Sequence, residues 1–304
     1  MWLGFLLVSL AGICWVGTGI VVSMCAKRGI NYTIVQMLSD LILVPVCLIF
    51  AFFQGGFNCD REIYLTVLGF CFIGGIGNYF TFLLTEAAMK RGPNGLVWGI
   101  MQAGMIGTFL MGVFCFGEKA SWRSWLFLFI VLAGVILSGL KKENKPEDAV
   151  KSSGLAWLWF SIAAMVCIAF TQCTVVFPSF MKGGTDAGSA IRLLGLSAGA
   201  VLAFSATTLP ALLKKHEFYI VKGTWTMTIL RVLISIFASI FFFVYGVDRL
   251  AAAGCGGLGY PVAIGVCLIG FSVYSLCILR EKLTKVGLIG LLSIILGIIG
   301  MSMR

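Results

Sequence analysis

Long apolar runs, separated by short clusters of charged and turn residues, make up most of the chain. Each run holds about 19–26 residues, the number that an α-helix rising 1.5 Å per residue needs to cross a bilayer core of ~30 Å. The runs are continuously apolar, whereas the strands of a membrane barrel alternate. This pattern predicts an all-α integral membrane protein with ten transmembrane helices. The predicted helices cover residues 2–26, 33–54, 63–85, 95–117, 122–140, 154–177, 188–213, 224–247, 255–279 and 285–303.

A charged stretch near the middle of the chain, residues 141–151, is the longest connection between apolar runs. It predicts one compact membrane domain built from two five-helix halves. These are residues 1–140 and 153–304, joined by a charged linker loop over residues 141–152.

Two short signatures recur in the two halves. Gly117-Glu118-Lys119 precedes the fifth run and Arg280-Glu281-Lys282 precedes the tenth, and a glycine follows each glutamate after sixteen residues. The segments 92–98 and 254–260 share glycines, a leucine and a final aromatic residue at an offset of 162. The halves are therefore predicted to be copies of one unit. Since five spans is an odd number, the two copies must be inverted relative to each other, as in many secondary transporters.

The composition excludes several classes of protein. With 60% hydrophobic residues, 11% charged residues and a mean hydropathy of +1.05, the chain lacks the polar surface of a soluble domain. The eleven cysteines have no C-x-x-C spacing and the one histidine is His216, so we predict no metal site, no disulfide framework and no cofactor. The sequence has no phosphate-binding glycine loop and no plausible Ser-His-Asp set, so we do not expect an enzyme.

The cations indicate how the chain lies in the membrane. The net charge of +10 does not indicate nucleic-acid binding, because the cations fall singly or in small clusters between apolar runs. Of the 22 cations, 14 follow odd-numbered runs and 6 lie on the opposite side, which places both termini outside the cytoplasm. We expect the plasma membrane of a bacterium. The expected partners are a small-molecule substrate and membrane lipid, with the chain as a monomer or homodimer.

The paired glutamate turns, each followed by a glycine-bearing last helix, resemble those of the ten-helix members of the drug/metabolite transporter superfamily. The resemblance covers essentially the whole chain. It implies a basket of ten helices with antiparallel halves, a central cavity, and peripheral fifth and tenth helices. Members of the superfamily move amino acids, sugars and their phosphates, nucleotide sugars or drugs. Small multidrug relatives couple to protons through a glutamate in their first helix, whereas this chain has no carboxylate between Trp2 and Ala26.

Three acidic residues are candidates for proton coupling. Asp40 lies inside the second run, where a carboxylate must face protein or water. It is either a proton carrier or substrate contact, or a structural partner of Ser39, Gln36 or a nearby arginine. Glu86 and Asp248 end the third and eighth runs at equivalent positions of the two halves. Such a pair either gates the protein or couples to protons, or its members cap helices or meet loop cations such as Lys90 and Arg249.

Substrate-binding candidates are polar or aromatic residues inside the runs. Arg231 is the deepest cation and holds an anionic substrate group, pairs with a carboxylate across the cavity, or reaches back to the interface near Lys222. Arg192 lies nearer the edge of its run. Trp98 and Tyr260 each follow a glycine-rich start and either stack on a solute or belong to an interfacial belt. The remaining candidates, which alternatively join helices, are Gln102, Trp15, Thr18, Asn78, Tyr79, Thr171 and Gln172.

These features together predict a secondary transporter of a small polar metabolite, a sugar or an amino acid, that works by alternating access. Proton-coupled symport or antiport is left open. A flippase for a lipid-linked substrate and an organic-anion exchanger are the alternatives.

Overall fold

The computed structural model of the chain is a bundle of helices, with no strand among the residues that it describes. Those residues are 1–117, 121–139, 155–215, 219–254, 256–280 and 284–302. The predicted linker over residues 141–152 falls entirely outside them, as do His216 and the two glutamate turns at positions 118–119 and 281–282.

Regular α-helix makes up most of the bundle, with short 3₁₀ segments (η1 and η3) and π-helical segments (η2 and η4) between α-helices. The elements are α1 (Trp2–Arg28), α2 (Tyr32–Phe53), α3 (Arg61–Met89), α4 (Asn94–Gln102), η1 (Ala103–Met105), α5 (Ile106–Phe116), α6 (Trp122–Gly139), α7 (Ala156–Phe180), α8 (Gly188–Lys214), α9 (Thr224–Ser235), η2 (Ile236–Phe243), α10 (Val244–Ala252), η3 (Gly256–Leu258), α11 (Gly259–Val273), η4 (Tyr274–Ile278) and α12 (Lys285–Ser302).

The all-α membrane fold predicted from the hydrophobic pattern is confirmed. Eight helical segments are long and apolar enough to cross a membrane, among them the composite segments Asn94–Phe116, Thr224–Ala252 and Gly256–Ile278. Two shorter apolar helices, Trp122–Gly134 and Lys285–Gly297, complete the ten. The composite segments differ from the prediction of uninterrupted helices, because hydropathy does not report the hydrogen-bond register inside a helix.

The turn between α1 and α2 shows how local sequence ends one helix and begins the next. Gly29 ends α1 with φ of 66°, a left-handed conformation that glycine adopts without steric cost, and its N–H donates to the carbonyl of Cys25. Asn31 caps α2, where its side-chain oxygen accepts from the N–H of Thr33 at 3.0 Å.

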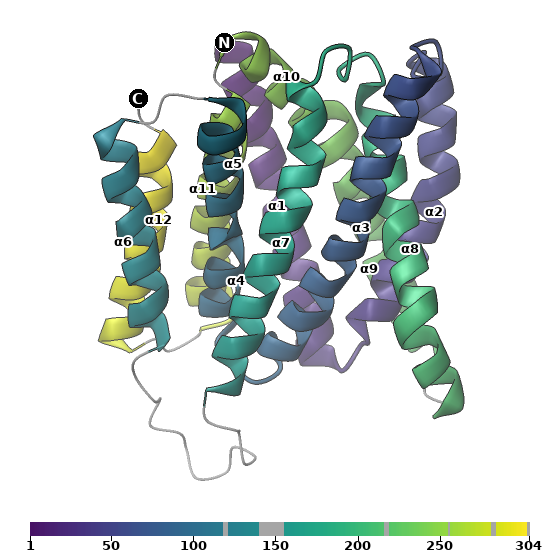
Figure 1. Cartoon of the computed structure of the whole chain (residues 1–304). Coiled ribbons are helices and arrows are strands. Elements are labelled where there is room, and N and C mark those ends of the chain that lie inside the picture. Colours follow the sequence, from purple (N-terminus) through teal and green to yellow (C-terminus); the bar gives the residue numbers. More distant parts are fainter. Residues whose placement is uncertain (118–120, 140–154, 216–218, 255, 281–283, 303–304) are drawn as a thin grey trace.

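The helices pack as a basket with one pair at its edge (Figure 1). α3 lies between α7 and α8, α1 packs against α11 and the α9–η2–α10 segment, and α2 packs against α8 and α9. α6 and α12 pack chiefly against each other at one edge of the bundle (Figure 1). This peripheral position agrees with the expectation for the fifth and tenth helices.

Glycines allow α3 and α8 to approach closely. A Cβ atom at Gly75 would lie 2.1 Å from the carbonyl oxygen of Leu196, and one at Gly199 would lie 1.9 Å from that of Phe72. Small residues at such crossings let helix backbones touch in a membrane. Packing is therefore the function of Gly195-x-x-x-Gly199, since Gly195 also faces the α3 backbone at Leu68.

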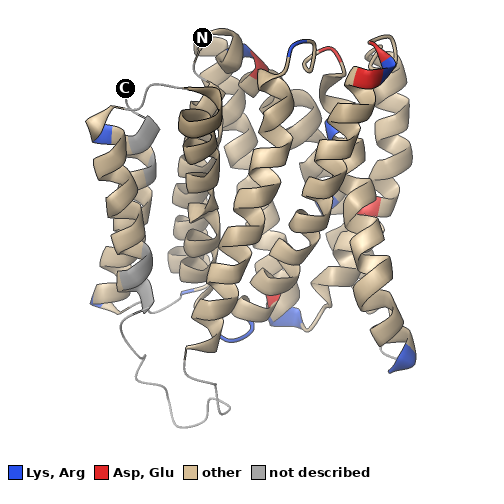
Figure 2. Ribbon diagram, viewed as in Figure 1, with Lys and Arg blue, Asp and Glu red and all other residues tan. Residues whose placement is uncertain are grey.

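The charged residues gather at the two ends of the helices, and few lie between them (Figure 2). The long middle sections of the helices are apolar, with exposed side chains such as Phe129, Val166 and Ile289. This distribution is typical of a bundle whose outer surface faces lipid. The few buried charges therefore stand out as candidates for function.

Candidate functional site

A cavity of about 140 Å³ lies within the bundle. Side chains from α1, α2, α3, α4, α7, α8, α9, η2, α10 and α11 line it, and no described residue of α6 or α12 does so. The cavity holds most of the residues predicted for the site. These are Trp15, Thr18, Asp40, Asn78, Trp98, Gln102, Thr171, Gln172, Arg231 and Tyr260.

An ion pair between α2 and α9 forms one wall of the cavity. Arg231 Nη1 donates to Asp40 Oδ1 at 2.9 Å, and Arg231 Nη2 donates to Asp40 Oδ2 at 3.4 Å. Arg231 Nε donates to the hydroxyl of Tyr32 at 3.1 Å, and its guanidinium lies 5.9 Å from the centre of the Phe82 ring. Both charged side chains are at most 5% exposed. Such a pair is tolerated away from water only because each charge meets the other.

A second ion pair joins α8 to α10. Arg192 Nη2 donates to Asp248 Oδ1 at 3.0 Å, and Arg192 Nη1 donates to Ser179 Oγ at 2.7 Å. Ser179 Oγ in turn donates to Asp248 Oδ1 at 2.8 Å, so the three side chains form a closed network. Arg192 lines the cavity and is 2% exposed. The network binds the end of α7 to the start of α8 and to α10.

Three aromatic rings make an apolar wall. Trp15 and Tyr260 stack with ring centres 5.8 Å apart and an angle of 16° between their planes. Phe243 contacts both rings, at 4.8 Å from Trp15 and 4.4 Å from Tyr260. The interfacial alternative for Tyr260 therefore does not apply, because Tyr260 is 7% exposed and lines the cavity.

Trp98 is buried inside the bundle, whereas a residue of an interfacial belt faces the lipid headgroups. It is 1% exposed, lines the cavity and contacts the Phe271 ring at 5.3 Å. Gln102, on the same helix, donates to Cys267 Sγ at 3.6 Å. The pair joins α4 to α11 on the cavity wall.

The neutral polar residues of the cavity wall differ in their contacts. Thr171 Oγ1 donates to the carbonyls of Gly74 and Cys167 at 3.0 and 3.1 Å, so its hydroxyl joins α7 to α3. Asn78 and Gln172 also line the cavity, and Gln172 Oε1 is buried without a hydrogen-bond partner among the described residues.

Tyr79 lies apart from the cavity. Its hydroxyl is hydrogen-bonded to Thr208, and its ring contacts those of Phe80 and Phe204. Tyr79 thus packs α3 against α8, and its position gives no support to the substrate contact predicted for it.

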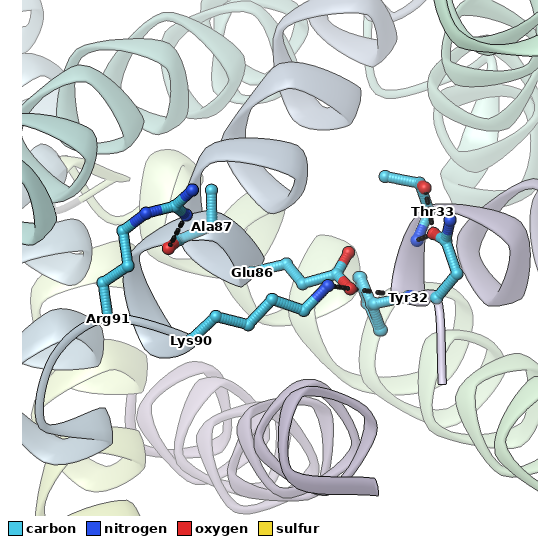
Figure 3. Close-up of polar contacts among 7 residues, drawn as sticks. Tyr32, Thr33, Glu86, Ala87, Lys90 and Arg91 are labelled. Atoms are coloured by element: carbon cyan, nitrogen blue, oxygen red, sulfur yellow. Dashed lines mark hydrogen bonds and ion pairs between the residues drawn. The ribbon is translucent and has the colours of Figure 1, made fainter. Parts of the chain in front are cut away.

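Glu86 also lies outside the cavity lining. Its Oε1 accepts from Lys90 Nζ at 2.6 Å and from the N–H of Tyr32 at 3.1 Å (Figure 3). Glu86 therefore joins the end of α3 to the start of α2, next to the Asn31 cap. It does not meet Asp248, which pairs with Arg192, so the two acids predicted as a symmetric pair belong to separate networks.

Metal chemistry has no site in the described part of the chain. No group of three or more histidine, cysteine, aspartate or glutamate residues converges there. The ten cysteines in that part are free thiols, most of them at least partly buried among apolar side chains.

Among the lining residues that the sequence analysis did not select for the site are Arg192, Ser235, Ser239 and Phe243. Arg192 was set aside as an edge residue. The other three follow Arg231 at intervals of four, a spacing that marks one face of a helix. Ser239 and Phe243 belong to the π-helical segment η2, where Ser189 Oγ donates to the carbonyl of Ile240 at 3.0 Å. π-Helical turns of this kind are frequent at functional sites.

Residues 2–140 match the EamA-like transporter family. That family is part of the drug/metabolite transporter superfamily, so the first half of the chain is similar to transporters of this superfamily. The all-helical structure agrees with the ten-helix membrane fold of that family, and the chain is an integral multi-pass membrane protein. The superfamily resemblance inferred from the sequence is thereby confirmed over residues 2–140.

The solved structures agree with this fold. Sixteen chains match, and one of them, titled "Crystal structure of protein", is 14% identical with a TM-score of 0.61. That match covers 98% of this chain and 95% of the other, so the likeness extends over both halves. No curated protein matches the chain.

Proposed function

We propose that the protein is a secondary transporter that carries a small polar metabolite, a sugar or an amino acid, by alternating access. The observation that carries the proposal is the cavity, which holds Asp40, Arg192 and Arg231 inside a lipid-facing bundle. Charged and amide side chains within a membrane are costly unless they face partners, water or a solute. Aromatic rings beside them suit the apolar face of a sugar or of an amino-acid side chain.

The size of the cavity favours a small solute. A water molecule needs about 10–15 Å³ of such space, so ≈ 140 Å³ corresponds to roughly ten waters. That space matches a metabolite of the size of an amino acid or a monosaccharide better than a drug or a nucleotide sugar.

Contacts between the two halves come in corresponding pairs, which supports inverted repeats. Where a helix of the first half packs on a helix of the second, their counterparts in the opposite halves also pack on each other. α3 packs on α7, and the corresponding α9–η2–α10 segment packs on α1. Likewise α1 packs on α11, and α7 packs on the α4–η1–α5 segment. Asp40 and Arg192 are 152 positions apart. The same offset relates Val8-Ser9-Leu10-Ala11 in the first helix of one half to the similar Phe160-Ser161-Ile162-Ala163 in the first helix of the other. A site shared by corresponding helices of two inverted units is the arrangement on which alternating access depends.

Purified protein in proteoliposomes tests the proposal. Uptake of amino acids, sugars and organic acids is measured with and without a pH gradient, alongside protein-free liposomes. We expect saturable uptake of at least one small polar solute and faster exchange when the same solute is present on the other side. Movement of a lipid-linked sugar without uptake of any water-soluble solute would instead support a flippase.

Proton coupling through Asp40 is tested with matched variants. Asp40→Asn/Arg231→Gln removes both charges, so neither charge is left alone in the cavity. If Asp40 carries the coupled proton, the double variant loses the dependence of uptake on the pH gradient while still exchanging solute. Arg123→Gln, at the exposed start of α6, serves as the control variant. An unchanged pH dependence in the double variant would make Asp40 structural.

The proposed orientation has both termini outside the cytoplasm of a bacterial cell. Figure 1 supports a common side, since the N-terminus and the end of α12 lie at the same face of the bundle. Alkaline phosphatase fused after Arg304 is expected to be active, and green fluorescent protein fused there is expected to be dark. Fusions truncated in the linker, after Lys145, should give the opposite result. Fluorescence from the full-length fusion would mean that both termini lie in the cytoplasm instead.

A further inference from the structure

The two arginines that line the cavity differ in how completely their guanidinium groups are bonded. Arg231 uses all three nitrogens, with Nε on the Tyr32 hydroxyl and Nη1 and Nη2 on the two oxygens of Asp40. Every nitrogen of Arg231 therefore already donates to a protein partner, and a solute anion would have to compete with Asp40 for this guanidinium. Arg231 is therefore poorly placed to recognise an anionic group.

Arg192 retains a free donor. Its Nη1 donates to Ser179, and its Nη2 donates to Asp248 Oδ1 at 3.0 Å and, at a longer 3.5 Å, to the carbonyl of Gly184. Its Nε is buried and has no hydrogen-bond partner within the described part of the chain. The Nε–Nη2 edge, the edge that binds a carboxylate through two parallel hydrogen bonds, thus has one empty position.

Gln172 supplies the complementary free group. Its Oε1 is buried and has no partner among the described residues, and the side chain is 3% exposed on the cavity wall. A buried donor and a buried acceptor left unpaired on one cavity are costly to the empty protein. A solute that presents both an acceptor and a donor satisfies both groups together.

We propose that Arg192 binds a carboxylate of the transported solute and that Gln172 accepts a hydrogen bond from an ammonium or hydroxyl group on the same molecule. The solute class is small amino or hydroxy acids. The inference rests on the proposed transport function and narrows its substrate. Asp248 holds the guanidinium through one oxygen, so a solute carboxylate gains two parallel hydrogen bonds by displacing that single contact.

The balance of charge at the cavity supports the amino-acid members of this class. The two arginines meet two carboxylates, Asp40 and Asp248. A neutral sugar leaves Arg192 Nε without an anionic partner, and a free amine adds an uncompensated cation to a low-dielectric site. The solute carboxylate matches the open edge of Arg192, and in an amino acid the ammonium group restores neutrality. The aromatic wall of Trp15, Phe243 and Tyr260 offers an apolar surface for the side chain of the solute.

Thermal unfolding of the wild-type protein in detergent tests the carboxylate directly. Each proteinogenic amino acid and a set of lactate-type hydroxy acids are compared with the corresponding amide, for example L-serine with L-serinamide and L-lactate with L-lactamide. D-glucose represents neutral solutes. We expect at least one acid to raise the unfolding midpoint by several degrees and its amide to leave the midpoint unchanged. Equal shifts by an acid and its amide, or no shift by any acid, would overturn the proposal.

Variants then assign the carboxylate to Arg192. Arg192→Lys keeps the positive charge and loses the planar edge, so affinity for the acid should fall at least about tenfold, whereas Arg123→Gln should bind as the wild type does. Gln172→Leu should weaken binding of the amino acid and leave the folded protein intact. An Arg192→Lys variant with wild-type affinity contradicts the assignment.

The inference and the proposed function fail in different ways. Saturable uptake of glucose, with no binding of any acid, overturns the role of Arg192 and leaves secondary transport standing. Absence of uptake for every solute in the panel counts against transport of a small polar metabolite itself. If the Arg192 variants do not fold, the comparison of each acid with its amide on the wild-type protein still decides the proposal.

Discussion

Asp40→Asn is expected to lower the free energy of unfolding by about 3–5 kcal/mol, the usual cost of removing one member of a buried ion pair. The substitution leaves Arg231 buried, at 5% side-chain exposure, with a neutral amide in place of its counter-ion. An arginine cannot lose its proton inside a protein, so the uncompensated charge persists. Thermal unfolding in detergent, followed through buried thiols such as Cys25 and Cys47 with a thiol-reactive dye, measures the loss.

The double variant provides the decisive control. Asp40→Asn/Arg231→Gln leaves no buried charge at this position, so it should recover most of the stability that Asp40→Asn loses. Arg231→Gln alone should cost less than Asp40→Asn, because a carboxyl group without its cation can take up a proton. If the double variant is as unstable as the sum of the two single variants, the two side chains do not interact in the folded protein.

The hydrophobic pattern of the sequence predicted the ten helices, because each helix must span the same hydrocarbon core of the bilayer. The ends were less accurate where charged residues continue a helix. α3 runs on to Met89, past the predicted end at residue 85, because Glu86 is neutralised by Lys90 one turn later and accepts from the N–H of Tyr32. The breaks at Ala103–Met105 and Ile236–Phe243 were not predicted, because their residues are as apolar as those of a regular helix.

The site was predictable as a set of residues and not as a set of contacts. Asp40 and Arg231 stood out because charges are rare inside apolar runs, and both line the cavity. Their pairing joins positions 191 residues apart, which hydropathy cannot report. Arg192 was undervalued because nearness to the end of a run usually means an interfacial side chain. Here α8 begins among the ends of α7 and α10, so the same position is 2% exposed.

Gly75→Ala adds a single methyl group and is expected to lower the free energy of unfolding by about 3 kcal/mol. The new Cβ would lie 2.1 Å from the carbonyl oxygen of Leu196 and 3.0 Å from the backbone nitrogen of Ala200. Both contacts are with backbone, so no side-chain rotation can relieve them. α3 and α8 must separate instead, which also moves Asn78 and Leu196 on the cavity wall.

Gly69→Ala is the matched control on the same helix. No heavy atom lies within 4 Å of a Cβ at Gly69, so the substitution should change the unfolding free energy by no more than about 1 kcal/mol and should leave solute affinity unchanged. Thermal unfolding and solute binding are measured on both variants. Equal midpoints would mean that α3 and α8 do not touch at Gly75. A large loss of affinity at Gly75→Ala, with none at Gly69→Ala, would show that the contact between these backbones sets the spacing of the cavity wall.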